Sequence, residues 1–516
     1  MSRGSSLLIA AVLALLAGCA GLPPLPDRTP SSAFTDTTDT RLGRAAAPYI
    51  AAAPPQTSGV HLFAEPRDAF AARMLLAATA EKSIDAQYYI WHGDQVGILL
   101  YEALWKAAER GVRVRLLLDD INTKGLDPTI AALDAHPNIE VRLYNPFVQR
   151  QSRFWGYLTD FARLNKRMHN KSFTADNQAS VVGGRNVGNE YFGAGDGIGF
   201  VDLDALVIGA AVREVSQQFD LYWNSASAYP AAGFVGTSSP DGTAALQARF
   251  AATRADPSSV DYLRAVRDSP LITELQARRL SLEWTTVHVV HDDPAKTLAT
   301  GGDTDVLLFP ELVRKMGRPE TTFDIVSPYF VPGDVGTASL TEMTQRGVKV
   351  RILTNSLAAT DVSVVHAGYE KRRHDLLVAG VVLYELKPAA TAESTSEEAK
   401  VGSSAASGLH AKTYAVDATR IFVGSFNFDP RSAHLNTEMG LVIDSPGFAA
   451  RLSSAFDTVV PRLAYEVRLA PDGSALVWIE RTPSGEERRY DHDPGTGAFK
   501  RGLVKFLSML PIEWLL

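Results

Sequence analysis

The chain has one cysteine among 516 residues, so no disulfide can form within it. It also has no excess of positive charge. The formal net charge is −7, which argues against a nucleic-acid partner, because strong binding needs a basic surface to displace counterions from phosphates. Its carboxylates and histidines form no plausible ligand cluster, so we expect neither a metal nor another cofactor. The remaining composition, 46% hydrophobic and 21% charged, is that of a globular protein long enough for two domains.

Residues 1–19 have the pattern of a signal sequence. Arg3 precedes an apolar run from Leu7 to Ala17. As a helix this run rises only about 16 Å, too short for the roughly 30 Å hydrocarbon core of a bilayer. Leu16-Ala17-Gly18-Cys19 resembles a bacterial lipobox, whose cysteine is lipidated and becomes the mature N-terminus; cleavage by an ordinary signal peptidase is the alternative. Ala20, in place of aspartate, favours the outer membrane by the same resemblance. We therefore expect a periplasm-facing protein of the cell envelope, anchored through Cys19.

One pattern, HxKxxxxD, occurs twice in the chain. The two copies are His169, Lys171 and Asp176, and then His410, Lys412 and Asp417. Each HxK lies in a segment that alternates like a strand, so its histidine and lysine share one face and can point at one phosphate. Two histidines and two lysines at a shared interface can cleave a phosphodiester without a metal, because one histidine attacks phosphorus and the other protonates the departing oxygen.

A glycine-containing turn follows each copy, and its first glycine comes seven positions after the aspartate in both cases. The turns are Gly183-Gly184-Arg185-Asn186 and Gly424-Ser425-Phe426-Asn427. We expect the glycines to let the backbone approach a ligand and the asparagines to donate to phosphate oxygens.

The body of the chain is an internal duplication. Strand, helix, strand, helix, strand is predicted in both halves, which indicates a sheet with crossover helices and functional residues at the strand ends. The predicted strands are 83–91, 111–118 and 139–144, and then 323–331, 347–353 and 381–386. We predict a flexible tether over 20–59, a first domain over 60–250, a helical connector over 251–283, a second domain over 284–460, and a C-terminal tail over 461–516.

The duplicated motifs resemble the phospholipase D superfamily, whose signature is this HxKxxxxDxxxxxxGSxN run in two copies. The resemblance covers about Val60 to Val460, and the first copy departs from it by carrying Gly184 where serine is usual. It implies an α/β fold of two mixed β-sheets flanked by helices, related by a pseudo-twofold axis with the active site between them. Further stretches are most similar to C-type cardiolipin synthases, which are phosphatidyltransferases in bacterial lipoprotein form. These stretches are 163–169 and 510–516, whereas 429–432 and 436–438 resemble the tail of the second motif in cardiolipin synthases and their relatives in general.

The resemblance also implies which residues are catalytic: His169, Lys171 and Asp176 of the first motif, and His410, Lys412 and Asp417 of the second. His169 forms a phosphatidyl-histidine, and His410 protonates the departing alcohol and then activates the incoming one, although the near symmetry leaves the reverse assignment open. Lys171 and Lys412, aided by Arg431, neutralise the phosphate.

Two histidine-orienting carboxylates are implied as well. Glu438 is expected to hydrogen-bond His410, and Asp202 or Asp204 to do the same for His169; the sequence does not choose between these two aspartates. The other residues expected to bind or orient the substrate are Gly183, Gly184, Asn186, Gly424, Ser425, Asn427, Arg431 and Asn436.

Phosphatidylglycerol and phosphatidylethanolamine are the expected lipid substrates, with the membrane as partner. A glycerol hydroxyl as acceptor yields cardiolipin, whereas water yields phosphatidic acid and makes the protein a hydrolase, either a phospholipase or a nuclease. The net negative charge and the expected lipid anchor at Cys19 argue against the nuclease. A non-catalytic lipoprotein scaffold is the third hypothesis, disfavoured because both motifs are complete.

Several features have two interpretations. For Asp119-Asp120, capping is favoured over metal binding. His366 is either a structural histidine or a contact to a lipid headgroup. The basic residues between 163 and 167 either attract anionic headgroups or are solvated. Residues 389–408 are either a lid or a passive insertion, and the segment 499–516 suits either the bilayer interface or the body of the protein. For Tyr88, Tyr89, Tyr329 and Phe330, core packing is favoured over lining a lipid channel.

Overall fold

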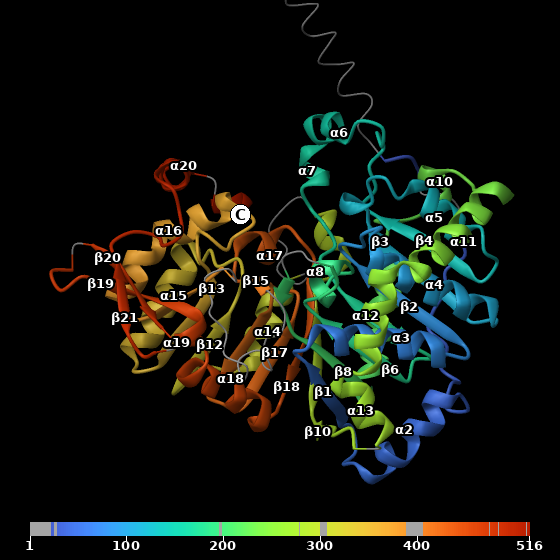
Figure 1. Cartoon of the computed structure of the whole chain (residues 1–516), viewed down its shortest axis with the longest axis horizontal. Coiled ribbons are helices and arrows are strands. Elements are labelled where there is room, and N and C mark those ends of the chain that lie inside the picture. Colours follow the sequence, from blue (N-terminus) through green and yellow to red (C-terminus); the bar gives the residue numbers. More distant parts are fainter. Residues whose placement is uncertain are drawn as a thin grey trace, which may run out of the picture.

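The computed structural model describes residues 22–24, 28–195, 199–277, 279–299, 307–388, 406–473, 475–482, 484–511 and 513–516. Two halves lie side by side, each built on a mixed sheet with helices against it (Figure 1). The expected α/β fold is therefore confirmed. The signal sequence, Cys19 and residues 389–405 of the predicted lid lie outside the described residues.

The first half contains a nine-stranded sheet in the order β10-β1-β8-β6-β5-β2-β3-β4-β9. In chain order its strands are β1 Ser58–Phe63, β2 Ser83–Tyr88, β3 Arg113–Asp119, β4 Ile139–Tyr144, β5 Ser172–Ala175, β6 Ala179–Gly183, β8 Asp204–Gly209, β9 Ala228–Pro230 and β10 Glu283–Thr285. Strands β2, β3 and β4 are parallel, whereas β5, β6 and β8 return antiparallel.

Helices pack around this sheet, and several begin with proline, which suits the first helical position because its missing N–H has no partner there. They are α2 Arg41–Ala52, α3 Pro66–Thr79, α4 Gln95–Glu109, α5 Asp127–Asp134, α6 Arg153–Thr159, α7 Phe161–Leu164, α8 Asn189–Phe192, α9 Ala210–Trp223, α10 Ala232–Val235, α11 Pro240–Ala255, α12 Pro257–Arg267 and α13 Pro270–Gln276, with the 3₁₀ turns η1 Asp120–Asn122 and η2 Pro294–Thr297.

The second half contains a ten-stranded sheet in the order β11-β18-β17-β16-β12-β13-β14-β19-β20-β21. Its strands are β11 Val287–His291, β12 Thr322–Val326, β13 Lys349–Asn355, β14 Val382–Leu386, β16 Lys412–Val416, β17 Arg420–Gly424, β18 Met439–Ile443, β19 Ala464–Leu469, β20 Leu476–Arg481 and β21 Glu487–Tyr490. Its helices are α14 Leu308–Met316, α15 Gly333–Gln345, α16 Ser363–Val378, α17 Pro430–His434, α18 Pro446–Thr458, α19 Val460–Leu463 and α20 Ala498–Ser508, with η5 Glu513–Leu515.

The duplication appears directly in the strand order. The series β8-β6-β5-β2-β3-β4 of the first sheet matches β18-β17-β16-β12-β13-β14 of the second. The first HxK motif ends immediately before β5, and the lysine of the second, Lys412, is the first residue of β16. The two motifs therefore occupy equivalent positions in the two halves.

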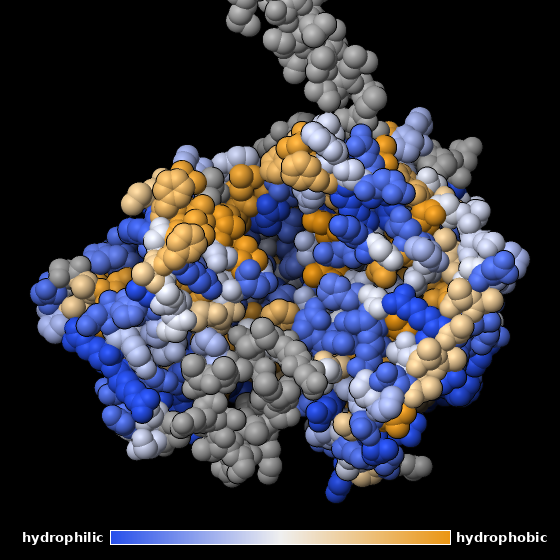
Figure 2. Space-filling model, turned by 45° about the horizontal axis from the view of Figure 1, so that its top comes forward, coloured by the Kyte–Doolittle hydropathy of each residue, from blue (hydrophilic) through white to orange (hydrophobic). Residues whose placement is uncertain are grey.

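The halves meet through an apolar interface. One buried cluster combines Val182 and Val207 of the first sheet with Met439 and Leu441 of the second. A small parallel pair, β7 Gly199–Val201 with β15 Ala406–Leu409, also joins them. Figure 2 shows a hollow between the two halves with hydrophobic surface on both sides of it.

The predicted domain borders need correction. The tether is not flexible throughout: α2 and β1 form within it, and Arg28 donates to the carbonyl oxygens of Asn224 and Ser225 at 2.7 and 2.6 Å. The connector over 251–283 is helical as predicted, but α12 and α13 pack on α3, so it belongs to the first half. The chain passes between the sheets after Thr285 rather than at 284.

The segment 461–516 is not simply a tail. It supplies β19, β20 and β21 to the second sheet, because β19 pairs antiparallel with β14. Helix α20 then packs on α16 with Val504 buried. Among the described helices, none is long and apolar enough to cross a membrane.

Candidate active site

The two HxK segments meet at the interface between the halves. The His169 backbone N–H donates to the Thr437 oxygen of the other half at 2.8 Å, and the His410 N–H donates to the Val201 oxygen at 2.8 Å. Each segment is thus fixed by the opposite half before its own strand begins. Both imidazoles are buried, as are the side chains of Lys171 and Lys412.

The histidines are oriented by carboxylates that cross the interface. Nδ1 of His169 lies 2.8 Å from Glu438 Oε2, and Nδ1 of His410 lies 2.6 Å from Asp202 Oδ2. The expectation that each carboxylate serves the histidine of its own half is therefore wrong. Because each HxK segment pairs with the opposite half, the nearest carboxylate belongs to that half.

The choice between Asp202 and Asp204 is also decided by geometry. Asp204 forms an ion pair with Arg73 at 2.9 Å inside the first half, where both side chains are fully buried. Neither His169 nor His410 contacts it, and it is a structural residue.

Gly184, the departure from the usual serine, makes room for Asp202. A Cβ atom at this position would lie 2.2 Å from Asp202 Oδ1. In the second half Ser425 occupies the matching position, and its hydroxyl donates to Glu438 Oε2 at 2.5 Å. The same turn position therefore faces the carboxylate in both halves, as glycine in the first and as serine in the second.

Glu438 is held by two further residues. The Ser432 hydroxyl donates to Oε1 at 2.9 Å, and the Glu438 backbone N–H donates to Asp292 Oδ2 at 2.8 Å. Lys296 in turn pairs with Asp292 at 3.0 Å. Sequence reasoning gave neither residue a role: Ser432 lies in the stretch 429–432, which carried only the family resemblance, and Asp292 lies in no motif.

Burial dominates the electrostatics of the site. It lowers the pKa of His410 to about 4 and, together with the nearby lysine charges, lowers the pKa of His169 well below its usual value. Burial also lowers the pKa of Lys412 to about 8 and strongly lowers that of Lys171. An anion bound here would raise the pKa of both histidines and both lysines, because its negative charge favours their protonated forms.

The two carboxylates respond differently to this environment. Burial raises the pKa of Glu438 to about 7, against the opposing effect of Lys171. Burial also disfavours the charged form of Asp202, but His410 and Lys412 outweigh it and lower the pKa of Asp202 to about 2. The site is therefore asymmetric: the pKa of Asp202 lies below the usual value of a carboxyl group and that of Glu438 lies above it, so Asp202 is the more readily ionised of the two.

The motif aspartates lie away from this site. The Asp417 carboxylate accepts the backbone N–H groups of Glu320, Thr321 and Thr322 at 3.0, 2.7 and 2.9 Å. Asp176 accepts those of 81–83 in the same way. Both stand at the far end of the strand that follows their lysine, so their assignment as catalytic groups is wrong. Their role is to hold the start of β2 and β12.

Gly183 and Gly424 are required by neighbouring strands rather than by a ligand. A Cβ on Gly183 would lie 2.6 Å from the Asp204 Cα, and one on Gly424 would lie 2.6 Å from the Gly440 Cα. The prediction that these two glycines open the backbone to a ligand is therefore replaced by close packing of β6 on β8 and of β17 on β18.

Arg431 does not point its guanidinium at the phosphate position. Nε donates to Leu515 O at 3.0 Å, Nη1 to Asn165 O at 3.0 Å, and Nη2 to Asn165 Oδ1 at 2.8 Å. All three nitrogens are thus engaged in joining the C-terminal segment to the residue after α7. The expected aid to the lysines is contradicted by this geometry.

The asparagines divide between structure and site. Asn186 accepts from the Ile90 N–H at 3.2 Å and donates to the Tyr191 hydroxyl at 3.1 Å, so its amide positions an aromatic side chain. Asn427 and Asn436 are buried, and the amide oxygen of each has no hydrogen-bond partner among the described residues.

Aromatic rings line the histidines. Tyr89 contacts His169 edge-on at 4.9 Å between ring centres, and Tyr191 contacts His410 at 5.1 Å. Phe200 lies 5.3 Å from His410. Tyr88 and Phe330 are core residues as favoured, but Tyr89 faces the site. Tyr191 and Phe200 carried no signal in the sequence, because neither lies in a motif.

Two further features with two interpretations, Asp119-Asp120 and His366, have structural roles. Asp119 caps η1 through the Ile121 N–H at 2.9 Å and binds buried Arg167 at 2.6 Å. His366 is on α16 against Tyr369 and Asp493, apart from the histidines of the site. No group of three or more potential metal ligands occurs in the described part of the chain.

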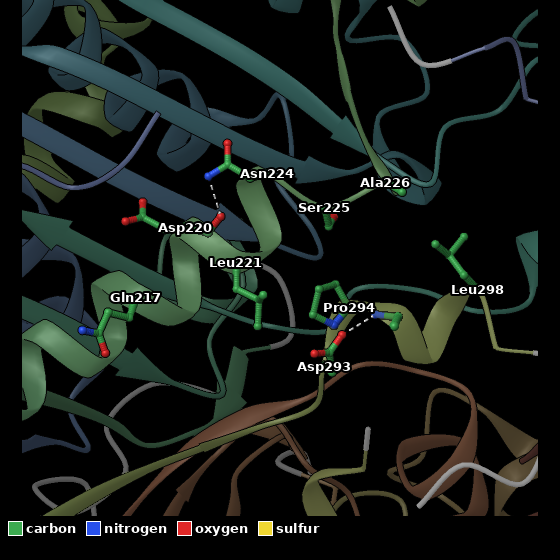
Figure 3. Close-up of a pocket in the computed structure, with 10 residues that line it drawn as sticks. Gln217, Asp220, Leu221, Asn224, Ser225, Ala226, Asp293, Pro294 and Leu298 are labelled. Carbon is green, nitrogen blue, oxygen red and sulfur yellow. Dashed lines mark hydrogen bonds between the residues drawn. The ribbon is translucent and has the colours of Figure 1, made fainter. Parts of the chain in front are cut away.

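A separate cavity of about 560 Å³ lies between the end of α9 and residues 293–298 (Figure 3). Its two carboxylates already have partners: Asp220 binds Arg115 at 2.7 Å, and Asp293 accepts the Ala295 N–H at 2.8 Å. None of the HxK residues lines it. We assign no chemistry to this cavity.

Comparisons with known proteins agree with the geometry. A family model described as "Cardiolipin synthase, PLD-like domain" matches residues 74–223 and 312–460. The chain is 46% identical to cardiolipin synthase C of Escherichia coli strain K12, covering 92% of this chain and 100% of that protein. It is 25% identical to the major cardiolipin synthase ClsA of Bacillus subtilis strain 168, over 79% of this chain and 70% of that protein.

Among solved structures, the phosphatidylserine synthase of Haemophilus influenzae Rd KW20 is similar in fold. Its TM-score is 0.56 at 12% identity, covering 92% of this chain and 100% of that chain.

Proposed function

This chain belongs to the cardiolipin synthase family of phospholipase D-like proteins, and we propose that it is a phosphatidyltransferase that forms cardiolipin through a phosphatidyl-histidine. The observation that carries the proposal is the crossed pairing of His169 with Glu438 and of His410 with Asp202. This pairing fixes two imidazoles at one interface beside two buried lysines. A phosphodiester there would meet a nucleophile, an acid and two cations.

In the first half-reaction, Nε2 of His169 attacks phosphorus while the bond to the headgroup oxygen breaks. Glu438 occupies Nδ1, so Nε2 is the reacting nitrogen. His410 gives its Nε2 proton to the departing alcohol. Ionised Asp202 supports the imidazolium this requires, and it is the carboxylate with the lower pKa, about 2. This asymmetry supports His410 as the acid and His169 as the nucleophile.

In the second half-reaction, His410 takes a proton from an incoming hydroxyl, whose oxygen attacks phosphorus and displaces His169. Phosphatidylglycerol supplies that hydroxyl, and phosphatidylglycerol or phosphatidylethanolamine donates the phosphatidyl group. The released alcohol is glycerol or ethanolamine accordingly. Lys171 and Lys412 gain an anionic partner when the phosphate enters, which offsets the burial that lowers their pKa.

We further propose that the protein works at the cell envelope, lipidated at Cys19, facing the periplasm and sorted to the outer membrane. The sequence Leu16-Ala17-Gly18-Cys19 followed by Ala20 supports this placement. Metabolic labelling with palmitate and separation of inner and outer membranes test it. Loss of label in Cys19→Ala is expected, and label retained in that variant contradicts the anchor.

The activity is tested with the full chain reconstituted in vesicles of phosphatidylglycerol and phosphatidylethanolamine, with products resolved by thin-layer chromatography. Cardiolipin is expected from the wild type and from His366→Ala, a matched change of a buried histidine outside the site. His169→Ala and His410→Ala are expected to form none. Phosphatidic acid without cardiolipin would instead make the protein a hydrolase.

A further inference from the structure

Two clusters of exposed apolar side chains lie along the same edge of the molecule. The α6–α7 cluster consists of Phe154, Trp155, Leu158 and Phe161. The α20 cluster consists of Phe499, Leu503, Phe506, Met509 and Trp514. Helices α6, α7 and α20 lie along the top edge in Figure 1, and hydrophobic surface flanks the hollow between the halves in Figure 2. Exposed apolar surface of this extent marks a docking site.

Helix α20 has two distinct faces. Val504 is buried against Leu357 and Ala367, whereas Phe499, Leu503 and Phe506 follow one another at helical spacing on the solvent side. Phe499 is 86% exposed. Lys500 and Lys505 lie on either side of this apolar stripe. An apolar stripe bordered by lysines fits the surface of an anionic bilayer.

The positions of the tryptophans also indicate that this edge binds the surface of a bilayer. The chain has seven tryptophans, and only Trp155 and Trp514 are exposed, at 58% and 62%. One belongs to each cluster. Tryptophan is the side chain enriched at the boundary between hydrocarbon and water, because its ring is apolar and its N–H is polar.

The clusters are joined beside the active site by Arg431. Its guanidinium binds Asn165, the residue after α7, and Leu515, the neighbour of Trp514. Asn165 precedes His169 by only four positions. A surface that contacts both clusters would therefore lie next to the catalytic histidines.

The beginning of the described chain lies near the same edge. The Tyr229 hydroxyl donates to Pro23 O at 3.2 Å, and Tyr229 also interacts electrostatically with Arg163 of α7. Cys19 precedes Leu22 by three positions, a reach of about 10 Å in an extended chain. An acyl anchor at Cys19 would thus enter the bilayer beside α6 and α7.

We propose that the α6–α7 and α20 clusters form one docking face that inserts into an anionic bilayer and turns the mouth of the active site toward the lipid. Lipid substrates then reach the histidines without leaving their leaflet; this consequence rests on the proposed function, whereas the docking does not. The occupant is the bilayer itself, rather than a second copy of the chain or a soluble protein.

Tryptophan quenching tests the docking directly. The full chain is reconstituted in vesicles of phosphatidylglycerol and phosphatidylethanolamine that carry lipids brominated near the headgroup end of the acyl chain. Quenching is expected in the wild type and is expected to disappear in the double variant Trp155→Phe/Trp514→Phe. Trp284→Phe, a half-buried tryptophan near the opposite edge, is the matched control and should leave the quenching unchanged. Equal quenching in the double variant and the wild type overturns the proposal.

Activity on two forms of substrate separates docking from chemistry. Trp155→Glu and Phe506→Glu are expected to reduce turnover on vesicles about tenfold or more while leaving turnover on short-chain, monomeric lipids unchanged. Tyr49→Glu, an exposed aromatic residue on α2, should alter neither. Loss on both substrates in the two cluster variants, or a wild-type dimer that either one dissociates, overturns the proposal. Wild-type inactivity on both substrates would contradict the proposed function instead, since quenching reports docking without turnover.

Discussion

His169 and Glu438 are 269 positions apart in the chain, yet the imidazole Nδ1 lies 2.8 Å from the carboxylate. The matching contact, His410 with Asp202, crosses in the opposite direction. Each half of the duplicated fold therefore supplies one HxK histidine and the carboxylate that orients the histidine of the other half. Neither half alone holds a complete pair.

The crossed pairing predicts which step each carboxylate controls. Glu438→Gln should slow formation of the covalent intermediate at His169, and Asp202→Asn should impair proton transfer by His410. Losses of about 10–100-fold are expected, as for other residues that orient a reacting histidine. A leaving group with a low pKa needs no acid, so it should largely rescue Asp202→Asn but not Glu438→Gln. Equal rescue of both variants would contradict the crossed assignment.

Restoring the usual serine at position 184 should harm the protein. A Cβ there would lie 2.2 Å from Asp202 Oδ1, so Gly184→Ser displaces the carboxylate that holds His410. We expect kcat to fall about 10–100-fold with a folded protein. The reciprocal change, Ser425→Gly, removes a hydroxyl that donates to Glu438 and accepts the Met439 N–H, but it displaces no carboxylate and should cost less. Steady-state kinetics with a circular dichroism control compare the two; higher activity in Gly184→Ser would contradict this role.

Asp417 is expected to matter for stability rather than for chemistry. Asp417→Asn removes one of the two oxygens that accept three backbone N–H groups near the surface, so the free energy of unfolding should fall by about 0.5–1.5 kcal/mol with kcat nearly unchanged. These hydrogen bonds outweigh burial and lower the pKa of Asp417. Its contribution is therefore present above its unfolded value of about 3.9 and is lost as the pH falls through the lower folded value. Denaturant melts at several pH values measure this, and an unchanged stability at pH 7 would contradict it.

Anion binding should weaken above about pH 8. Burial lowers the pKa of Lys412 to about 8 and strongly lowers that of Lys171, so both ammonium groups lose their charge as the pH rises through these values. Calorimetry with sulfate, whose charge is constant in this range, should show weaker binding at pH 9 than at pH 7. The double variant Lys171→Arg/Lys412→Arg should bind sulfate equally at both pH values, because arginine stays charged. A persistent loss in that variant would contradict the assignment.

The sequence predicted the architecture well because the duplication repeats in periodicity as well as in motifs. Strand β4, Ile139–Tyr144, has the predicted bounds, and β3 and β13 differ from their predictions by a few residues. The site residues were largely found as well, since His169, Lys171, His410 and Lys412 are carried by one repeated pattern. A short repeated motif of this kind can be recognised in a single sequence.

What the sequence could not give was pairing between the halves. Whether Glu438 serves His410 or His169 depends on how the HxK segments cross the interface, and no local pattern encodes that crossing. The role of Asp417 was misjudged for a related reason: it belongs to the motif, yet its φ of 52° and its three backbone partners place it in a turn remote from the lysine. Arg431 was likewise wrongly assigned to the phosphate. Its contact with Leu515 joins segments far apart in the chain, and no local pattern shows such a contact.

The most direct measurement of the central claim is mass spectrometry of the covalent intermediate after rapid quenching at high pH, where phosphohistidine persists. The account predicts a phosphatidyl adduct on His169 in the wild type, a slowly formed adduct on His169 in His410→Ala, and none in His169→Ala. An adduct on His410, or cardiolipin formed by His169→Ala at the wild-type rate, would contradict it.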